Sequence, residues 1–213
     1  LPDMPLFVVA NEFFDALPIR QFQRSGAGWC ERVVGVQDGA LALGLTDPAP
    51  HAALQHRIAD TRDGDIIEIC PQAASVSRAL GAQIAARGGA ALIVDYGDWH
   101  ALGDTFQAVK AHKPVNPLAT PGHADLTAHV DFEALALAAA PARYSSLTPQ
   151  GVFLERLGIT ARAEALARHM SAPQRDAHIA AHRRLTHPDE MGSVFKVLGL
   201  FPPGASPPPG LDV

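Results

Sequence analysis

The chain has 213 residues, of which 47% are hydrophobic and 18% are charged, and its formal net charge is −5. This balance is typical of a folded globular protein, and the acidic net charge argues against the basic surface that nucleic-acid binding requires. No apolar stretch approaches the roughly 20 residues of a membrane-spanning helix, so we expect neither nucleic acid nor a membrane span.

The first predicted element is a strand over Leu6–Ala10, an unbroken apolar run rich in valine. A short run of this kind is typical of a strand that is buried on both faces of a parallel sheet. The run ends at Asn11 and Glu12, and Asp15 follows three residues later. Ligands of open α/β sheets bind beyond the carboxyl ends of the strands, so these polar residues form a candidate site. The alternative is a capped turn, with Asn11 or Asp15 as the capping residue.

Residues 19–45 are expected to form an antiparallel β meander. Short alternating segments follow one another there, and glycine-containing turns separate them. The next residues, 46–63, are predicted to be a loop with a short helix. Asp65–Cys70 is predicted to be a further strand, which ends at Pro71.

A second apolar strand is predicted over Ala90–Val94, after a helix over Ala73–Ala86. A helix that leads into a buried strand is half of a β-α-β crossover. We therefore expect Asp95, Tyr96 and Gly97 at the same carboxyl edge as the polar residues that end the first strand. The alternative for these three residues is an ordinary strand-to-loop turn in which Gly97 supplies a positive φ.

The remainder of the chain is predicted to be mostly helical. Asp104–His112 is predicted to be a short helix, and a proline-containing loop follows it to Ala128. Further helices are predicted over Phe132–Ala140, Val152–Leu157, Ala161–Met170 and Gln174–Leu185, with a last strand over Met191–Leu198. Residues 132–187 are interpreted as a helical insertion or cap. Residues 202–213 are interpreted as a proline-rich tail that is frayed over 202–210.

Imidazole and carboxylate side chains gather in the loop before residue 132, and such groups suit several metals. The polar members of this loop are His123, Asp125, Thr127, His129 and Asp131. The alternative, that they only hold the loop together, is the better one, and no metal ion is expected. The sequence has no glycine-rich turn between a strand and a helix. If this is a cofactor-binding α/β fold, its cofactor loop is therefore expected to lie outside this chain.

Six blocks of the sequence match, in the same order, the pattern of one known family. They are Ala10–Pro18, Gly89–Gly97, Gly103–Val109, Pro121–Phe132, Thr148–Leu154 and Met191–Lys196. These blocks resemble the MidA family of S-adenosylmethionine-dependent methyltransferases of bacteria and mitochondria. Mitochondrial members serve complex I assembly by methylating an arginine of a subunit. The resemblance therefore implies a methyltransferase with S-adenosyl-L-methionine as cofactor and a protein arginine as acceptor, with a complex I subunit as the type of partner.

The fold implied by this resemblance is the α/β class I methyltransferase fold, which is Rossmann-like. It has a mostly parallel sheet with helices on both faces, to which the β meander and the helical insertion are added. Family members carry a glycine-rich cofactor loop after their first strand and an acidic residue after the second. Neither feature is present here, so residues 1–201 are expected to be the carboxyl-terminal portion of such a domain.

The resemblance also implies roles for the residues at the predicted sheet edge. Leu6–Ala10 resembles the fourth strand of the fold, which implies Glu12 as a clamp for the guanidinium, Asn11 as its orienting group and Asp15 as support. His129 is the candidate for accepting the proton. The residues expected to line the pocket are Ala10, Asp95, Tyr96, Gly97, Asp125 and Thr127.

The main alternative function is a non-catalytic assembly or binding module with the same fold. A hydrolase is disfavoured, because the sequence has no nucleophile motif. Cys30 and Cys70 have neither zinc nor disulfide-framework spacing, which favours free thiols in a reducing compartment. We therefore expect a cytoplasmic protein in a bacterium, or a matrix protein if the chain is mitochondrial. The sequence predicts no oligomeric state.

Overall fold

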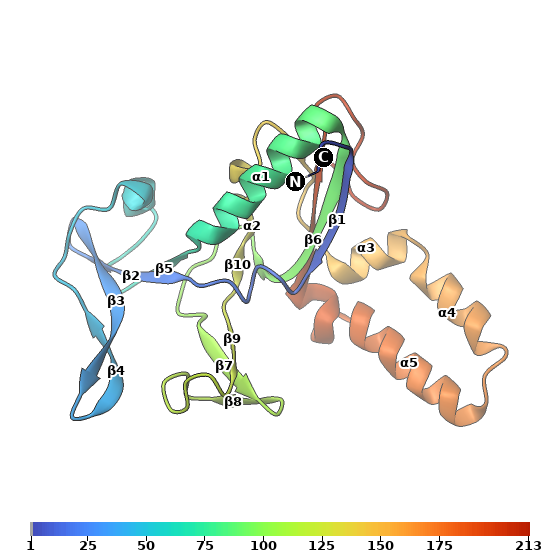
Figure 1. Ribbon diagram of the computed structural model, residues 1–213. Helices are drawn as coiled ribbons and strands as arrows, with labels where there is room; N and C mark the ends of the chain where they lie inside the picture. The colour runs from blue at the N-terminus through green and yellow to red at the C-terminus, as the bar shows by residue number, and fades with distance from the viewer. Residues whose placement is uncertain (1) are drawn as a thin grey trace. The chain divides into compact units, whose positions relative to one another are not determined.

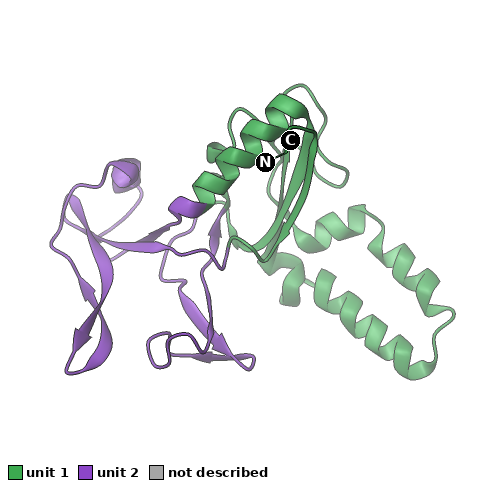
Figure 2. Cartoon of the chain, viewed as in Figure 1, with its two compact units in different colours: residues 1–14, 73–99, 132–213 green, residues 15–72, 100–131 purple. Residues whose placement is uncertain are grey.

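The computed structural model describes residues 2–213, which form two compact units (Figure 2). Unit 1 contains Ala73–Trp99, Phe132–Val213 and the described residues up to Phe14. Unit 2 contains Asp15–Gln72 and His100–Asp131. Within residues 2–213, no helix combines the length and the apolar character needed to cross a membrane.

The sheet of unit 1 is built on β6 (Gly89–Asp98). β1 (Leu6–Asn11) pairs with β6 in parallel, and β13 (Phe195–Phe201) pairs with it in the antiparallel sense. Two short strands, β11 (Arg143–Tyr144) and β12 (Thr148–Pro149), pair antiparallel with β13. The predicted α/β fold is confirmed, and the sheet in this chain is mixed. Because β1 and β6 run in the same direction, their carboxyl ends meet at one edge, as predicted.

Two helices pack with the sheet on one side of the unit 1 core. The helices are α1 (Pro71–Arg87) and α2 (Phe132–Ala138), and a hydrogen bond of 2.8 Å from the Ser77 hydroxyl to the Leu135 carbonyl joins them. Ile84 and Ile93 are completely buried, and α1 runs alongside β1 and β6 in Figure 1. Gly81 has no room for a side chain, because a Cβ there would overlap the Ala139 carbonyl.

A second cluster packs the end of the chain onto the sheet. α3 (Gln150–Arg156) contributes Phe153, which lies with Val197 and Leu211 against the half-buried Leu92 and Val94. Leu211 lies just after residues 202–210, for which fraying stays a prediction. The apolar side chain of Leu211 is buried in this cluster, which removes it from water and holds the end of the chain in place.

The first strand departs from its prediction of burial on both faces. Leu6, Val8 and Ala10 are half-buried, but Phe7 is 80% exposed and Val9 is 71% exposed. β1 lies at the end of the sheet, and within residues 2–213 no strand pairs with its outer edge. The prediction of a doubly buried strand is therefore wrong for the described part of the chain, because one face of β1 is left uncovered there.

Three helices follow β12 within unit 1. α4 (Ile159–Ala167) and α5 (Ala172–Thr186) form an antiparallel hairpin beyond α3 (Figure 1). His178 Nε2 lies 3.1 Å from the Ala163 carbonyl, and His182 Nε2 lies 3.0 Å from the Thr160 hydroxyl. Both imidazoles therefore link α5 to α4. A short π-helical turn (Pro188–Gly192) leads into β13. The prediction that residues 132–187 form a cap stays a prediction.

Unit 2 contains the predicted antiparallel meander, which is confirmed. Its strands are β2 (Arg20–Ser25), β3 (Gly28–Gln37) and β4 (Ala40–Leu45). The separately predicted strand β5 (Ile66–Ile69) extends the sheet to the order β4-β3-β2-β5. A 3₁₀ helix over Ala52–Ile58 provides the short helix expected after the meander. The core of this sheet consists of Phe22, Trp29, Leu54 and Ile67. Cys30 and Cys70, also in unit 2, are free thiols, of which Cys30 is buried and Cys70 is half-buried.

The helix predicted over residues 104–112 is wrong. The chain instead forms a hairpin of β7 (Gln107–Lys110) and β8 (Lys113–Val115). β9 (Asp125–Thr127) pairs with the other side of β7, and β10 (Val130–Asp131) follows. The turn at Ala111 and His112 has φ values of 50° and 60°, so both residues adopt the left-handed conformation that closes a two-residue hairpin.

Candidate active site

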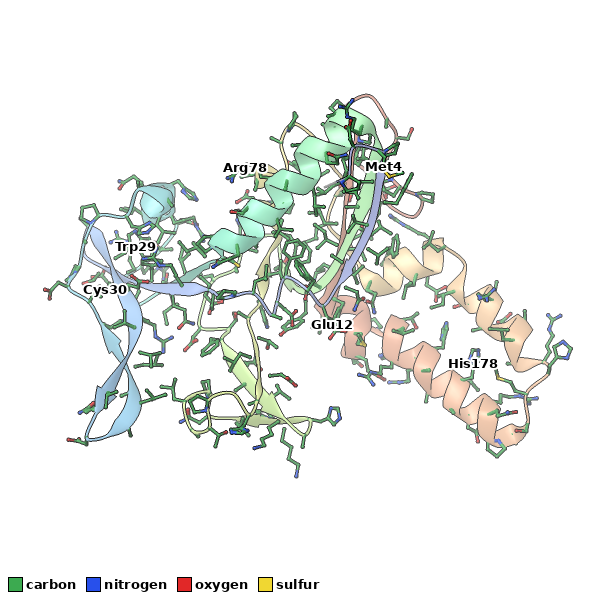
Figure 3. The ribbon with its side chains drawn as sticks, in the orientation of Figure 1. Met4, Glu12, Trp29, Cys30, Arg78 and His178 are labelled. Carbon is green, nitrogen blue, oxygen red and sulfur yellow. The ribbon has the colours of Figure 1, made fainter. Side chains whose placement is uncertain are left out.

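The carboxyl end of β1 presents an amide and a carboxylate to solvent. The backbone N–H of Glu12 donates to the Val94 carbonyl at 3.0 Å, which continues the pairing with β6 by one residue. Asn11 Nδ2 then donates to Glu12 Oε1 at 3.3 Å. Both side chains are exposed, and Figure 3 shows Glu12 at the end of the strand. No helix begins in residues 11–18, and Asp15 lies in a turn there, so the alternative of a capped turn stays open.

Asp95 joins the turn after β1 to the neighbouring strand. Its side chain is completely buried. One carboxylate oxygen accepts the backbone N–H of Phe14 at 3.0 Å, and the other accepts the N–H of Tyr96, also at 3.0 Å. Asp95 therefore fixes the turn that carries Glu12. The sequence predicts Asp95 as a pocket residue, and in the structure its carboxylate also positions the backbone of this turn.

The other predicted residues of β1 and β6 support this edge. Ala10 is half-buried and pairs with Ile93. The Tyr96 ring lies 5.7 Å from the Phe195 ring, centre to centre. Gly97 has a φ of 151°, a conformation in which glycine is favoured, but it lies inside β6 and not in a loop. The residues predicted at the edge of the parallel pair are thus together in unit 1.

Four of the predicted site residues belong to unit 2. Asp15 is buried, and its carbonyl accepts the Ala128 N–H at 3.0 Å. Asp125 is exposed and Thr127 is half-buried, both in β9. His129 is exposed, and its backbone N–H donates to the Thr105 hydroxyl at 2.8 Å.

A pocket of about 330 Å³ in unit 2 brings two of these residues together. Asp15 and Thr127 line it, with apolar walls that include Leu17, Val34 and Phe106. A volume of this size is at the lower end of the range for small-molecule sites, and it also suits a single side chain of a protein. The pocket therefore offers an apolar cleft bordered by a buried carboxylate.

A buried polar network in unit 2 is not predicted by the sequence. Gln21 Nε2 donates to Glu68 at 2.6 Å and to Asp104 at 2.7 Å, and Glu68 also accepts the Thr105 backbone N–H at 3.0 Å. The Thr105 hydroxyl donates to Glu68 while it accepts from His129. This network therefore holds the backbone at His129. A single acidic residue within the apolar run of β5 is the sequence signal that points to it.

One carboxylate of this network has a shifted pKa. Burial raises the pKa of Asp104, but hydrogen bonds from Arg32 and Gln21 outweigh that effect and hold the pKa below its ordinary value. The Arg32 guanidinium lies 2.6 Å from the carboxylate. Asp104 is therefore ionised over the whole neutral range. In the described part of the chain, no cluster of three or more His, Cys, Asp or Glu side chains is arranged to hold a metal ion.

Comparison with known proteins confirms the family resemblance. Residues 1–150 match the model of a family described as "Putative S-adenosyl-L-methionine-dependent methyltransferase". Mitochondrial protein arginine methyltransferase NDUFAF7 of Xenopus tropicalis is 35% identical over 207 residues, which cover 92% of this chain and 46% of the relative. The Homo sapiens protein of the same name is 36% identical over 204 residues, which cover 92% of this chain and 45% of the relative.

A solved structure matches over the whole chain. It is the crystal structure of a "likely methyl transferase" from Burkholderia thailandensis bound to S-adenosyl-homocysteine, with a TM-score of 0.79 and 29% sequence identity. The match covers 100% of this chain and 56% of that protein. The chain therefore spans about half the length of the relatives and the solved structure that it matches.

Proposed function

This chain belongs to that family of S-adenosyl-L-methionine-dependent methyltransferases, and on this premise we propose that the full-length protein methylates an arginine of a protein substrate. The proposal assigns to this chain the wall of the active site that faces the methyl acceptor. It assigns the main glycine-rich cofactor loop to a part of the protein outside this chain.

One observation carries the proposal. Asn11 and Glu12 stand exposed at the carboxyl end of β1, beside the parallel strand β6, and the buried Asp95 fixes the turn that follows them. Ligands of open α/β sheets bind at this kind of edge. The relatives are named protein arginine methyltransferases, which supports arginine as the acceptor, and they are about twice the length of this chain.

The acceptor chemistry follows from these side chains. A guanidinium is always charged and presents paired N–H donors that match the two oxygens of a carboxylate. Glu12 would hold the guanidinium and favour a lone pair on the nitrogen that is to be methylated, while Asn11 would orient it. Asp15 is proposed as support and His129 as proton acceptor, roles that rest on the family resemblance.

The residues of this chain fit one end of the cofactor. S-adenosyl-L-methionine, when bound, supplies an electrophilic methyl group on a positively charged sulfur, and the exposed carboxylate of Glu12 complements that charge. Within residues 2–213 no glycine-rich turn joins a strand to a following helix, so nothing described here fits the nucleoside end. We therefore limit the role of this chain to the reacting end and the acceptor.

The test is methyl transfer by the full-length protein from tritiated S-adenosyl-L-methionine to proteins of a cell extract, with methylarginine identified after acid hydrolysis. Glu12→Gln keeps the size of the side chain and removes its charge, and we expect the rate to fall about 100-fold. Glu164→Gln, an exposed change of the same kind in α4, is the control and should leave the rate unchanged. A normal rate for Glu12→Gln would show that the clamp role is wrong.

A separate measurement distinguishes the alternative of a non-catalytic module. Isothermal titration of the full-length protein with S-adenosyl-L-methionine should show saturable binding. The absence of binding would overturn the methyltransferase proposal and favour an assembly role.

The finer proposals concern partner and compartment. We propose a subunit of respiratory complex I as the substrate and a site of action in the mitochondrial matrix, or in the cytoplasm if the organism is a bacterium. The mitochondrial names of the relatives support the first compartment. Purified complex I that has been isolated from cells lacking the protein should accept tritiated methyl groups, whereas complex I from normal cells should not. Equal labelling of both would contradict this partner.

A further inference from the structure

Unit 1 contains a second cavity, which none of the proposed catalytic roles uses. Its volume is about 800 Å³, and it lies beyond the carboxyl end of β6, where Asp98 and Trp99 line it. Arg143 and Tyr144 of β11 and Lys196 of β13 line the other sides. This volume is large enough for several side chains of a bound peptide.

Two aromatic rings provide an apolar surface in this cavity. The rings of Trp99 and Tyr144 lie 5.8 Å apart, centre to centre, with their planes inclined by 39°. Trp99 is half-buried, and Tyr144 is 36% exposed. Rings held in this way bind apolar or aromatic side chains and lose little conformational freedom in doing so.

Two cations in the lining have no carboxylate partner among residues 2–213. Arg143 lies over the Phe201 ring at 5.6 Å, a contact that leaves the N–H groups of its guanidinium available. Lys196 Nζ donates to the Ser193 carbonyl at 2.6 Å and keeps two further donor hydrogens. Asp98 contributes a carboxylate to the lining, and its Oδ1 accepts the Trp99 backbone N–H at 2.8 Å. Positive side chains thus outnumber negative ones around the aromatic surface.

The cavity adjoins the strand end that carries the candidate active site. The register of β13 on β6 pairs Lys196 with Asp95, the residue that fixes the turn after β1. A protein substrate whose arginine reaches this edge would extend its neighbouring residues along the same end of unit 1.

We propose that this cavity binds the segment of the protein substrate that flanks the methylated arginine. It selects a segment in which an aspartate or glutamate lies next to an aromatic or large apolar residue. The carboxylate meets Arg143 and Lys196, and the apolar side chain packs on Trp99 and Tyr144. This inference rests on the proposed function, to which it adds the chemical character of the substrate.

The experiment compares two peptides on the full-length protein. One has an arginine followed by glycine, phenylalanine and two aspartates, and the other has asparagines in place of the aspartates. With a fluorescent label on each peptide, anisotropy titration should show about tenfold tighter binding of the acidic peptide. Raising the salt concentration from 0.05 M to 0.5 M should reduce the difference, because exposed ion pairs are screened.

Three variants test the assignment of the cavity. The double variant Arg143→Gln with Lys196→Gln should bind both peptides equally, whereas Lys113→Gln, an exposed change in unit 2, should keep the preference. Asp98→Asn removes a carboxylate from the lining and should strengthen binding of the acidic peptide, a gain that misfolding does not produce. Equal binding by the unaltered protein, or a preference that survives in the double variant, would overturn the inference.

Methyl transfer to both peptides is measured in parallel, which separates the two proposals. If methylarginine forms without any preference for the acidic peptide, only the cavity assignment is refuted. If the acidic peptide binds selectively but no peptide or protein is methylated, the proposed function is refuted while the charge selectivity of the cavity stands.

Discussion

The buried carboxylate of Asp95 permits a sharp test of how the candidate site is held in place. We consider Asp95→Asn, which conserves the shape of the side chain but turns one acceptor oxygen into an NH₂ donor. Asp95 accepts two backbone N–H groups at 3.0 Å, from Phe14 and Tyr96. An asparagine can accept only one of them with its oxygen, whichever way its amide is turned.

The expected cost follows from the hydrogen bonds that are lost. A hydrogen bond to a charged group contributes about 1.5–3 kcal/mol, and a buried N–H left without an acceptor costs about 1–3 kcal/mol. We therefore expect the turn after β1 to open more easily by about 2 kcal/mol, or roughly 30-fold in its opening equilibrium. The loss should be local, because the core formed by Ile93 and its neighbours is unchanged.

Hydrogen–deuterium exchange of the full-length protein measures this opening directly. In the variant, the amide of Phe14 or that of Tyr96 should exchange roughly 30-fold faster, while amides in the middle of β6 keep their protection. Asp98→Asn is the matched control for exchange. Asp98 also ends β6 and accepts a backbone N–H, but its side chain is exposed, so no buried amide loses its acceptor.

Unchanged exchange of both amides in Asp95→Asn would refute the positioning role. If the role is correct and the proposed function holds, methyl transfer should also fall, because the turn that carries Glu12 is no longer fixed. Exchange that increases equally over all of unit 1 would show instead that Asp95 stabilises the unit as a whole.

Two further predictions concern stability. Gly81→Ala should lower the free energy of unfolding in urea by about 2 kcal/mol, because the added Cβ overlaps the Ala139 carbonyl and the cost of this overlap exceeds the gain of about 1 kcal/mol in helix propensity. Gly44→Ala, where no atom lies within 4 Å of the new Cβ, is the control. An equal loss of stability in Gly44→Ala would contradict the role of the overlap. The pKa of Asp104 lies below its ordinary value in the folded protein. Its ion pair with Arg32 therefore stabilises unit 2 fully at pH values above the unfolded-state pKa of about 4. This contribution is lost as the pH falls through the lower pKa of the folded state. Unfolding of the unaltered protein and of Asp104→Asn is followed by the fluorescence of the buried Trp29. The difference between their unfolding free energies should be largest above about pH 4 and should vanish in stronger acid. A difference that does not change with pH would refute the role of the charge.

Strand positions were predictable where apolar runs and turn residues agree. The run over Leu6–Ala10 and the run over Ala90–Val94 each end in polar residues, and both are strands of one parallel pair. This local pattern was sufficient to place Glu12 and Asp95 at a common edge. It could not show that Asp95 is buried beneath the turn, because its partner Phe14 is distant in sequence and is brought near by the pairing of β1 with β6.

The errors and omissions have one local cause and two that depend on distant segments. The hairpin of β7 and β8 turns at Ala111 and His112, two residues that rarely adopt a positive φ, and neither is a glycine or an asparagine that would signal the turn. The burial of Leu211 depends on α3, which lies more than fifty residues earlier in the chain. The cavity lined by Trp99, Arg143 and Lys196 combines three separate segments, so no single stretch of sequence indicates it.

The uncovered strand β1 has a consequence for handling the protein. Its six residues, Leu6–Asn11, contain no proline and no charge, the two features with which proteins commonly protect such strands from unwanted pairing. With Phe7 and Val9 exposed beside a row of backbone groups that no strand within residues 2–213 engages, β1 is a template for a strand from another molecule. Produced by itself, this chain should therefore associate edge to edge into dimers and aggregates, and a lysine in place of Phe7 should keep it monomeric.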